Sequence, residues 1–168
     1  LASCTQKDDI KSTEIRQLVN KCVNLNVPTE DRLTAGLRAF DSIKEKCSND
    51  SITRNQLCEI AGSFYSLNET ECLKEISKFI LTNSIAAKDS NTLAKSHKFL
   101  GDYYLEMKLL DTSYSHYLQA IKFYKSLKNN AGLARSYYKL SVLQSNIFDN
   151  WNAQMSIIQA IKYSKSED

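Results

Sequence analysis

The feature that most constrains this chain is an internal repeat with a period of 40 residues. A leucine, an alanine, a serine and a second leucine recur at the same spacing in residues 93–100 and 133–140. The tetrapeptide QAIK at 119–122 likewise returns at 159–162. A period of this size is typical of stacked helical repeats, in which each unit buries its apolar face against its neighbours. The repeat therefore predicts an all-α chain.

Each repeat is expected to contain two antiparallel helices. Apolar, aromatic or small residues recur at the i, i+4, i+7, i+11 spacing of a helix face. In the first helix they are Leu93, His97, Leu100 and Tyr104, and in the second Ser113, Tyr117, Ala120 and Tyr124. Gly101 and Ala120 are expected to be points of close helix contact, because only a very small side chain lets a bulky neighbour approach the backbone.

These residues resemble the tetratricopeptide repeat over Leu93–Lys165. The likeness rests on the pair Leu100-Gly101, the aromatic residues Tyr104 and Tyr117, and the small residue Ala120. The period is longer than the family's standard unit, as in its longer-repeat variants. The resemblance implies an α-solenoid of about four antiparallel helix hairpins in a right-handed superhelix.

The expected hairpins divide the whole chain. They span residues 12–47, 51–88, 92–128 and 131–166, and 1–168 is predicted to be a single helical-repeat domain, with a segment of a longer array as the alternative. Thr29 is expected at a helix start. Asp111 and Asp149 are predicted N-caps, and Asn68 with Glu71 has the spacing of a capping box.

Composition narrows the classes of function. No apolar run approaches the ~20 residues of a membrane span, so no membrane partner is expected. The excess of three basic residues is too mild to indicate nucleic acid. Five cysteines at irregular spacing argue against a disulfide framework or a zinc site and favour free thiols in a reducing, intracellular compartment. They are Cys4, Cys22, Cys47, Cys58 and Cys72.

No catalytic constellation is visible in the sequence, and no cofactor or metal is predicted. The two histidines, His97 and His116, have no nucleophile or carboxylate at a recognisable spacing, and His97 is expected to pack where the repeat family has an aromatic residue. Tyrosines interleaved with lysines resemble a nucleic-acid platform, but core packing accounts for those at inward positions. Tyr103 and Tyr138 are left as candidate surface anchors.

One helix face carries the candidate binding residues. They lie on the first helices of the last two repeats and are Lys95, Lys98, Asp102, Leu105, Arg135, Tyr138, Lys139 and Val142. The family resemblance implies that such positions line a concave groove. Arg135 and Lys139 are expected to point to solvent. An ordinary solvated face explains the same pattern equally well.

The sequence thus favours a non-enzymatic module that binds a protein or peptide partner carrying acidic residues. The alternative is a structural one, in which the chain is a scaffold segment of a much larger helical-repeat protein, as in the helical regions of giant kinases or separase. In the scaffold alternative, both ends of the chain are expected to pack on further repeats, whereas a self-contained module should be monomeric and unfold cooperatively.

Overall fold

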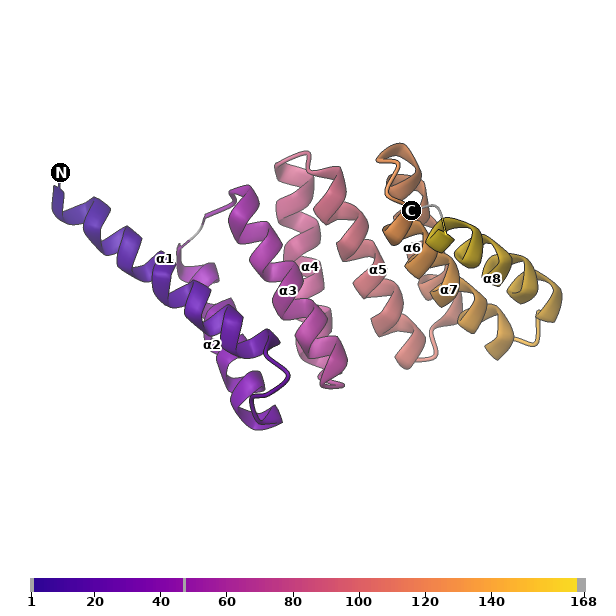
Figure 1. Ribbon diagram of the computed structural model, residues 1–168, viewed down its shortest axis with the longest axis horizontal. Helices are drawn as coiled ribbons and strands as arrows, with labels where there is room; N and C mark the ends of the chain where they lie inside the picture. Colours follow the sequence, from indigo (N-terminus) through magenta and orange to yellow (C-terminus); the bar gives the residue numbers. More distant parts are fainter. Residues whose placement is uncertain (1, 47, 166–168) are drawn as a thin grey trace. The chain divides into compact units, whose positions relative to one another are not determined.

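The computed structural model describes residues 2–46 and 48–165, with side chains from residue 10 onward. This part of the chain consists of eight α-helices and contains no strand, which confirms the all-α prediction (Figure 1). The helices are α1 (Ala2–Val23), α2 (Thr29–Lys46), α3 (Ser51–Ser66), α4 (Thr70–Ala86), α5 (Ser90–Glu106), α6 (Leu110–Ser126), α7 (Asn130–Asn146) and α8 (Asn150–Ser164).

The expected hairpin starts can be compared with these elements. Helices α3, α5 and α7 begin within two residues of the starts expected at 51, 92 and 131, and α2 begins at the predicted Thr29. The first predicted helix is wrong at its start, because α1 begins at Ala2 rather than near residue 12. Its first three turns lack the apolar spacing used for the prediction, yet they contain no Gly or Pro to end a helix.

The chain divides into two compact units, Leu1–Cys72 and Leu73–Asp168. The first unit contains α1, α2 and α3, and the second contains most of α4 together with α5 to α8. The expected single domain stays a prediction.

In the first unit, a buried arginine ties the end of α1 to α3. Arg32 on α2 donates from Nε to the carbonyl oxygen of Cys22 (2.9 Å) and from Nη2 to the Ser63 hydroxyl (3.2 Å). Ser63 donates to the same carbonyl (2.8 Å). A cation at a helix C-terminus is stabilised by the unpaired carbonyls and the helix dipole. Arg32 therefore acts as a cap for α1 while it links three helices.

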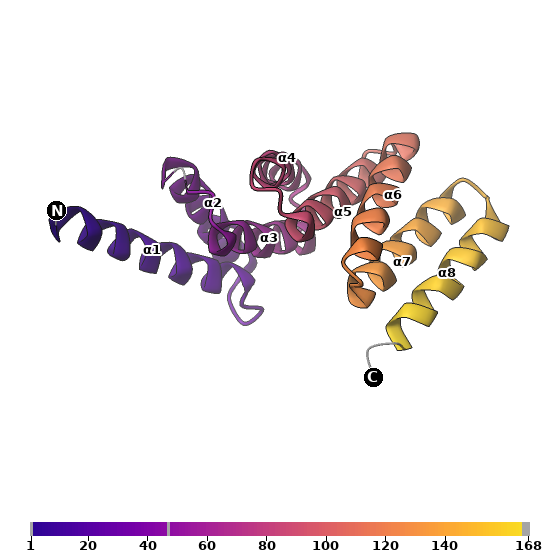
Figure 2. The same ribbon diagram turned by 90° about the horizontal axis from the view of Figure 1, so that it is seen from above.

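In the second unit, α5 packs against α6, α6 against α7 and α7 against α8 (Figure 2). Gly101 allows the close approach that the sequence predicted, since a Cβ there would lie 2.6 Å from Cε1 of Tyr117. A Cβ on Gly132 would lie 2.4 Å from Cδ1 of Tyr124. Both tyrosine rings are buried, so these glycines make room for core side chains across helix contacts.

The connections from α3 to α8 repeat every 20 residues, and each uses a non-glycine residue in the left-handed region. These residues are Asn68, Lys88, Lys108, Lys128 and Phe148, with φ between 53° and 59°. At each connection the next residue's N–H bonds back to a carbonyl five residues earlier, for example Asp89 to Ser84 and Asn129 to Tyr124. This is the Schellman motif, which satisfies the last carbonyls of a helix.

Two predicted caps are wrong, and one is confirmed. Asn68 ends α3 in the left-handed conformation instead of starting a capping box for α4. The N-cap of α6 is Leu109, whose side chain makes no capping hydrogen bond. Asp111 lies within the first turn instead, where its negative charge interacts favourably with the positive end of the helix dipole. Asp149 caps α8 as predicted, accepting from the backbone N–H of Asn152 (3.3 Å).

Candidate functional site

The predicted binding residues lie on two helices of the second unit that contact each other, α5 and α7. Helix α5 supplies Lys95, Lys98, Asp102 and Leu105, and α7 supplies Arg135, Tyr138, Lys139 and Val142. We call these eight residues the α5–α7 strip.

Asp102 is the centre of the strip, and it is buried, with 1% of its surface exposed. Its Oδ2 accepts from Lys98 Nζ at 2.7 Å, and its Oδ1 lies 3.5 Å from Lys139 Nζ. The Tyr117 hydroxyl donates to Oδ1 at 2.9 Å. A buried carboxylate is stable only when it is paired and hydrogen-bonded, and these three groups from α5, α6 and α7 provide both. One side chain therefore joins three helices.

Tyr117 reaches Asp102 because Gly101 leaves its path open. The tyrosine ring crosses α5 at the glycine, where any Cβ would meet it, and the hydroxyl then arrives at the neighbouring residue. The small-residue position and the buried acid thus belong to one local arrangement. The repeat pattern predicted the close helix contact at Gly101 but not the burial of Asp102.

Two expectations about the strip are wrong. Asp102 was expected on the exposed face, but the lysine one turn earlier and the lysine of α7 cover it. Lys139 was expected to point to solvent, whereas its side chain is only 21% exposed and is directed at Asp102. Both errors have the same cause: residue spacing identifies the faces of single helices but not the contact between α5 and α7.

The rest of the strip is more accessible. Arg135 and Tyr138 are exposed, and Lys95, Leu105 and Val142 are partly buried. Within the described part of the chain, no ion pair joins Lys95 or Arg135 to an acidic residue. With four cations and one carboxylate, the strip carries an excess of three positive charges.

Tyr103, the other candidate surface anchor, is buried, so that expectation is wrong. The Nζ of Lys74 on α4 lies 5.1 Å from the centre of its ring, within the range of a cation–π contact. Tyr138 is the exposed aromatic of the pair and remains the candidate anchor.

A second cluster lies between α5 and α6, where the two histidines meet. The Nδ1 atoms of His97 and His116 are 2.9 Å apart, and the rings stack on Phe123 and Tyr104 respectively. One Nδ1 must donate and the other accept, so at least the accepting ring is neutral, and when both rings are neutral they have opposite tautomers. Burial and the neighbouring His116 lower the pKa of His97 to about 4, and burial also lowers the pKa of His116. The stacking of His97 on Phe123 shows that the imidazole packs within the helix pair; the expected equivalence to the aromatic position of the repeat family stays a prediction.

This histidine pair offers two nitrogen atoms, and a protein zinc site generally has three or four ligands. Among the described side chains there is no group of three or more His, Cys, Asp or Glu residues placed to hold a metal ion. The pair is not recognisable in the sequence, because the two histidines are 19 residues apart and come together only through the α5–α6 packing.

The described cysteines are free thiols. Cys22 and Cys58 are buried and Cys72 is partly buried. Burial raises the pKa of the Cys22 thiol, which keeps it protonated and of low reactivity. Cys47 and the side chain of Cys4 lie outside the described residues.

Comparisons with other proteins add no assignment. The chain matches no protein-family model and none of the curated proteins. In the part of the chain that the structure describes, no helix is both long enough and apolar enough to cross a membrane.

Proposed function

We propose that this chain is a non-enzymatic interaction module, a solenoid similar to tetratricopeptide repeats, that binds an acidic peptide segment of a protein partner along the α5–α7 strip. The observation that carries the proposal is the buried Asp102, to which Lys98 of α5 and Lys139 of α7 are both anchored. It brings the cations of consecutive repeats onto one surface.

Lys95 and Arg135 supply the charge for an incoming ligand. They occupy equivalent positions, 40 residues apart, and neither is paired with an acid in the described part of the chain. Lys95 is partly buried and Arg135 is exposed, and cations at such rim positions raise the rate of association with an acidic partner and select for its charge. Arginine can also bind a carboxylate through two parallel hydrogen bonds.

Tyr138 supplies apolar contact area next to Arg135. It lies one helical turn after Arg135 on α7, and 53% of its surface is exposed. Aromatic residues dominate binding energy at protein interfaces when a partner side chain covers them. The strip therefore favours a segment that combines acidic residues with one large apolar residue.

The test measures binding of labelled peptides by fluorescence anisotropy. One series carries Asp and Glu around a single leucine, a second has Asn and Gln in their place, and a third has Lys. We expect only the acidic series to bind, with an affinity that falls as salt rises, since charges are screened over ~10 Å at 0.1 M salt.

The matched variants are chosen to leave Asp102 undisturbed. Lys95→Glu with Arg135→Glu should weaken acidic-peptide binding by at least ~10-fold, because two attractive contacts become repulsive. The control, Lys122→Glu with Lys128→Glu, changes net charge equally at exposed positions outside the strip. Equal weakening by both pairs, or no acidic peptide that binds, would refute the proposal.

A further inference from the structure

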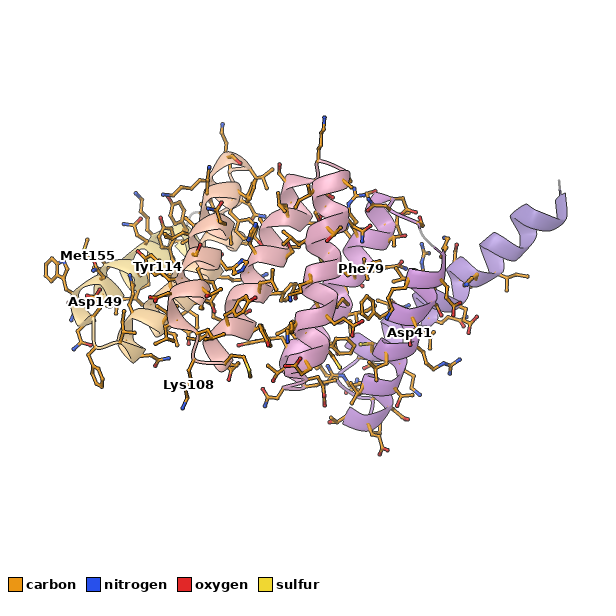
Figure 3. The ribbon with its side chains drawn as sticks, turned by 180° about the vertical axis from the view of Figure 1, so that it is seen from behind. Asp41, Phe79, Lys108, Tyr114, Asp149 and Met155 are labelled. Atoms are coloured by element: carbon orange, nitrogen blue, oxygen red, sulfur yellow. The ribbon has the colours of Figure 1, made fainter. Side chains whose placement is uncertain are left out.

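Helix α8 has a second apolar face that nothing in the described part of the chain covers. Its buried face, formed by Ala153, Ser156 and Ala160, packs toward the unit's interior. On the opposite side Trp151, Met155 and Ile158 follow the i, i+4, i+7 spacing of one helix face. All three are exposed, Trp151 at 72%. Figure 3 shows Met155 at the outer edge of α8 and Asp149 at the start of the helix.

The internal repeat shows that this face is particular to α8. The equivalent positions of α6, 40 residues earlier, hold Asp111 and Ser115 where α8 has Trp151 and Met155. A tryptophan and a methionine therefore replace the acid and the hydroxyl that the preceding repeat presents to solvent. A helix that is apolar on both sides is expected to be covered on both sides.

Neighbouring residues extend the same surface. Phe148, in the turn before α8, is 88% exposed, and Ile161 is 49% exposed, although its equivalent Ile121 on α6 is 5% exposed. Taking about 200 Å² for a large side chain, the five exposed fractions amount to roughly 600 Å² of apolar surface. Patches of about this size on a monomer are often functional, and two of them together approach the ~1,200 Å² at the lower end of stable interfaces.

The two ends of the face are complementary to each other. Trp151 lies at its start, and Lys162 continues the i, i+4, i+7 spacing to i+11 at its end. The N-cap Asp149 lies four residues before Ala153, on the side of the buried face, and takes no part in the pairing. If two copies of α8 pair antiparallel about a point between Met155 and Ile158, residue 151 of each copy lies opposite residue 162 of the other, which places each tryptophan ring against a lysine in a favourable cation–π pairing.

We infer that the outer face of α8 binds a second copy of this chain, forming a two-fold symmetric, antiparallel pair of α8 helices. The same patch serves both copies, as a two-fold interface requires. Its modest area gives a weak dimer, with a dissociation constant on the order of 10 µM. This surface is separate from the α5–α7 strip, so the inference does not depend on the proposed function.

Sedimentation velocity of the whole chain over a range of about 1 µM to 500 µM tests the inference, since that range spans the expected dissociation constant. We expect the wild type to shift from monomer to dimer. Ile158→Glu should remain monomeric throughout, because each copy would bury an unpaired carboxylate. The matched control is Leu118→Glu, the equivalent exposed position on α6, which should dimerise like the wild type.

A mixture of two variants tests the register of the pair. Met155→Lys and Ile158→Glu should each be monomeric alone, since each places like charges or unpaired charges in the interface. When they are mixed, residue 155 of one chain lies opposite residue 158 of the other, and the Lys–Glu pair should restore a heterodimer. A monomeric wild type over the whole range, or a dimer that Ile158→Glu leaves intact, would overturn the inference and leave a different partner for this face.

Discussion

Replacing Gly101 with alanine tests the arrangement at the centre of the second unit. In an ordinary helix interior this change stabilises by roughly 0.5–1 kcal/mol, because alanine has the better helix propensity. Here the new Cβ would lie 2.6 Å from Cε1 and 2.7 Å from Cδ1 of Tyr117. The ring is fully buried, so it has little room to move away from that contact.

Tyr117 is also tethered, which raises the cost of any movement. Its hydroxyl donates to the Asp102 carboxylate at 2.9 Å, a bond of the charged type worth about 1.5–3 kcal/mol. Overpacking adds about 1–3 kcal/mol. Set against the propensity gain of ~0.5–1 kcal/mol, these two costs together should lower the free energy of unfolding by roughly 1.5–5.5 kcal/mol.

The assay is urea unfolding followed by circular dichroism, with Gly62→Ala as the matched control. Gly62 also lies within a helix, α3, but a Cβ there would meet no atom within 4 Å. The control should therefore stabilise by about 0.5–1 kcal/mol. If Gly101→Ala stabilises to the same degree, the ring does not cross α5 at the glycine and the account of Asp102 fails.

Three further predictions concern other parts of the chain. The pKa of His97 is 6.5 in the unfolded chain and about 4 in the folded chain, so the unfolded state binds more protons between these two pH values. The free energy of unfolding should therefore fall as the pH drops from about 6.5 to 4. Thermal melts of His97→Phe over the same pH range should show a weaker fall. Lys128→Gly should raise the free energy of unfolding by about 1 kcal/mol in urea melts, because glycine adopts its positive φ without strain, whereas Lys128→Ala should not. Arg32→Met should cost about 2–4 kcal/mol by the same assay, since the buried carbonyl of Cys22 loses its charged donor, and a neutral result would contradict the capping role.

The helices could be predicted from sequence because their signals are local. The 40-residue period and the i, i+4, i+7 spacing marked α5 to α8, and the glycine at 101 correctly indicated a close contact. The turns gave weaker signals, since lysine or phenylalanine occupies positions where glycine would have marked a helix end. At Asp102, local pattern was misleading. An acid next to a lysine normally indicates a solvated face, and its burial depends on Tyr117 and Lys139, which lie 15 and 37 residues away.

The even spacing of the turns restricts how related chains can differ in length. Helices α4 to α7 each have 17 residues, and the connections between them have three. One residue inserted within a helix would rotate all later side chains of that helix by about 100°, and seven would keep the face but move the next turn by about 10 Å. Either insertion would break the equal spacing between one connection and the others. Gain or loss of a complete 40-residue helix pair leaves every other contact in place, so lineages of this chain should vary in length by whole pairs.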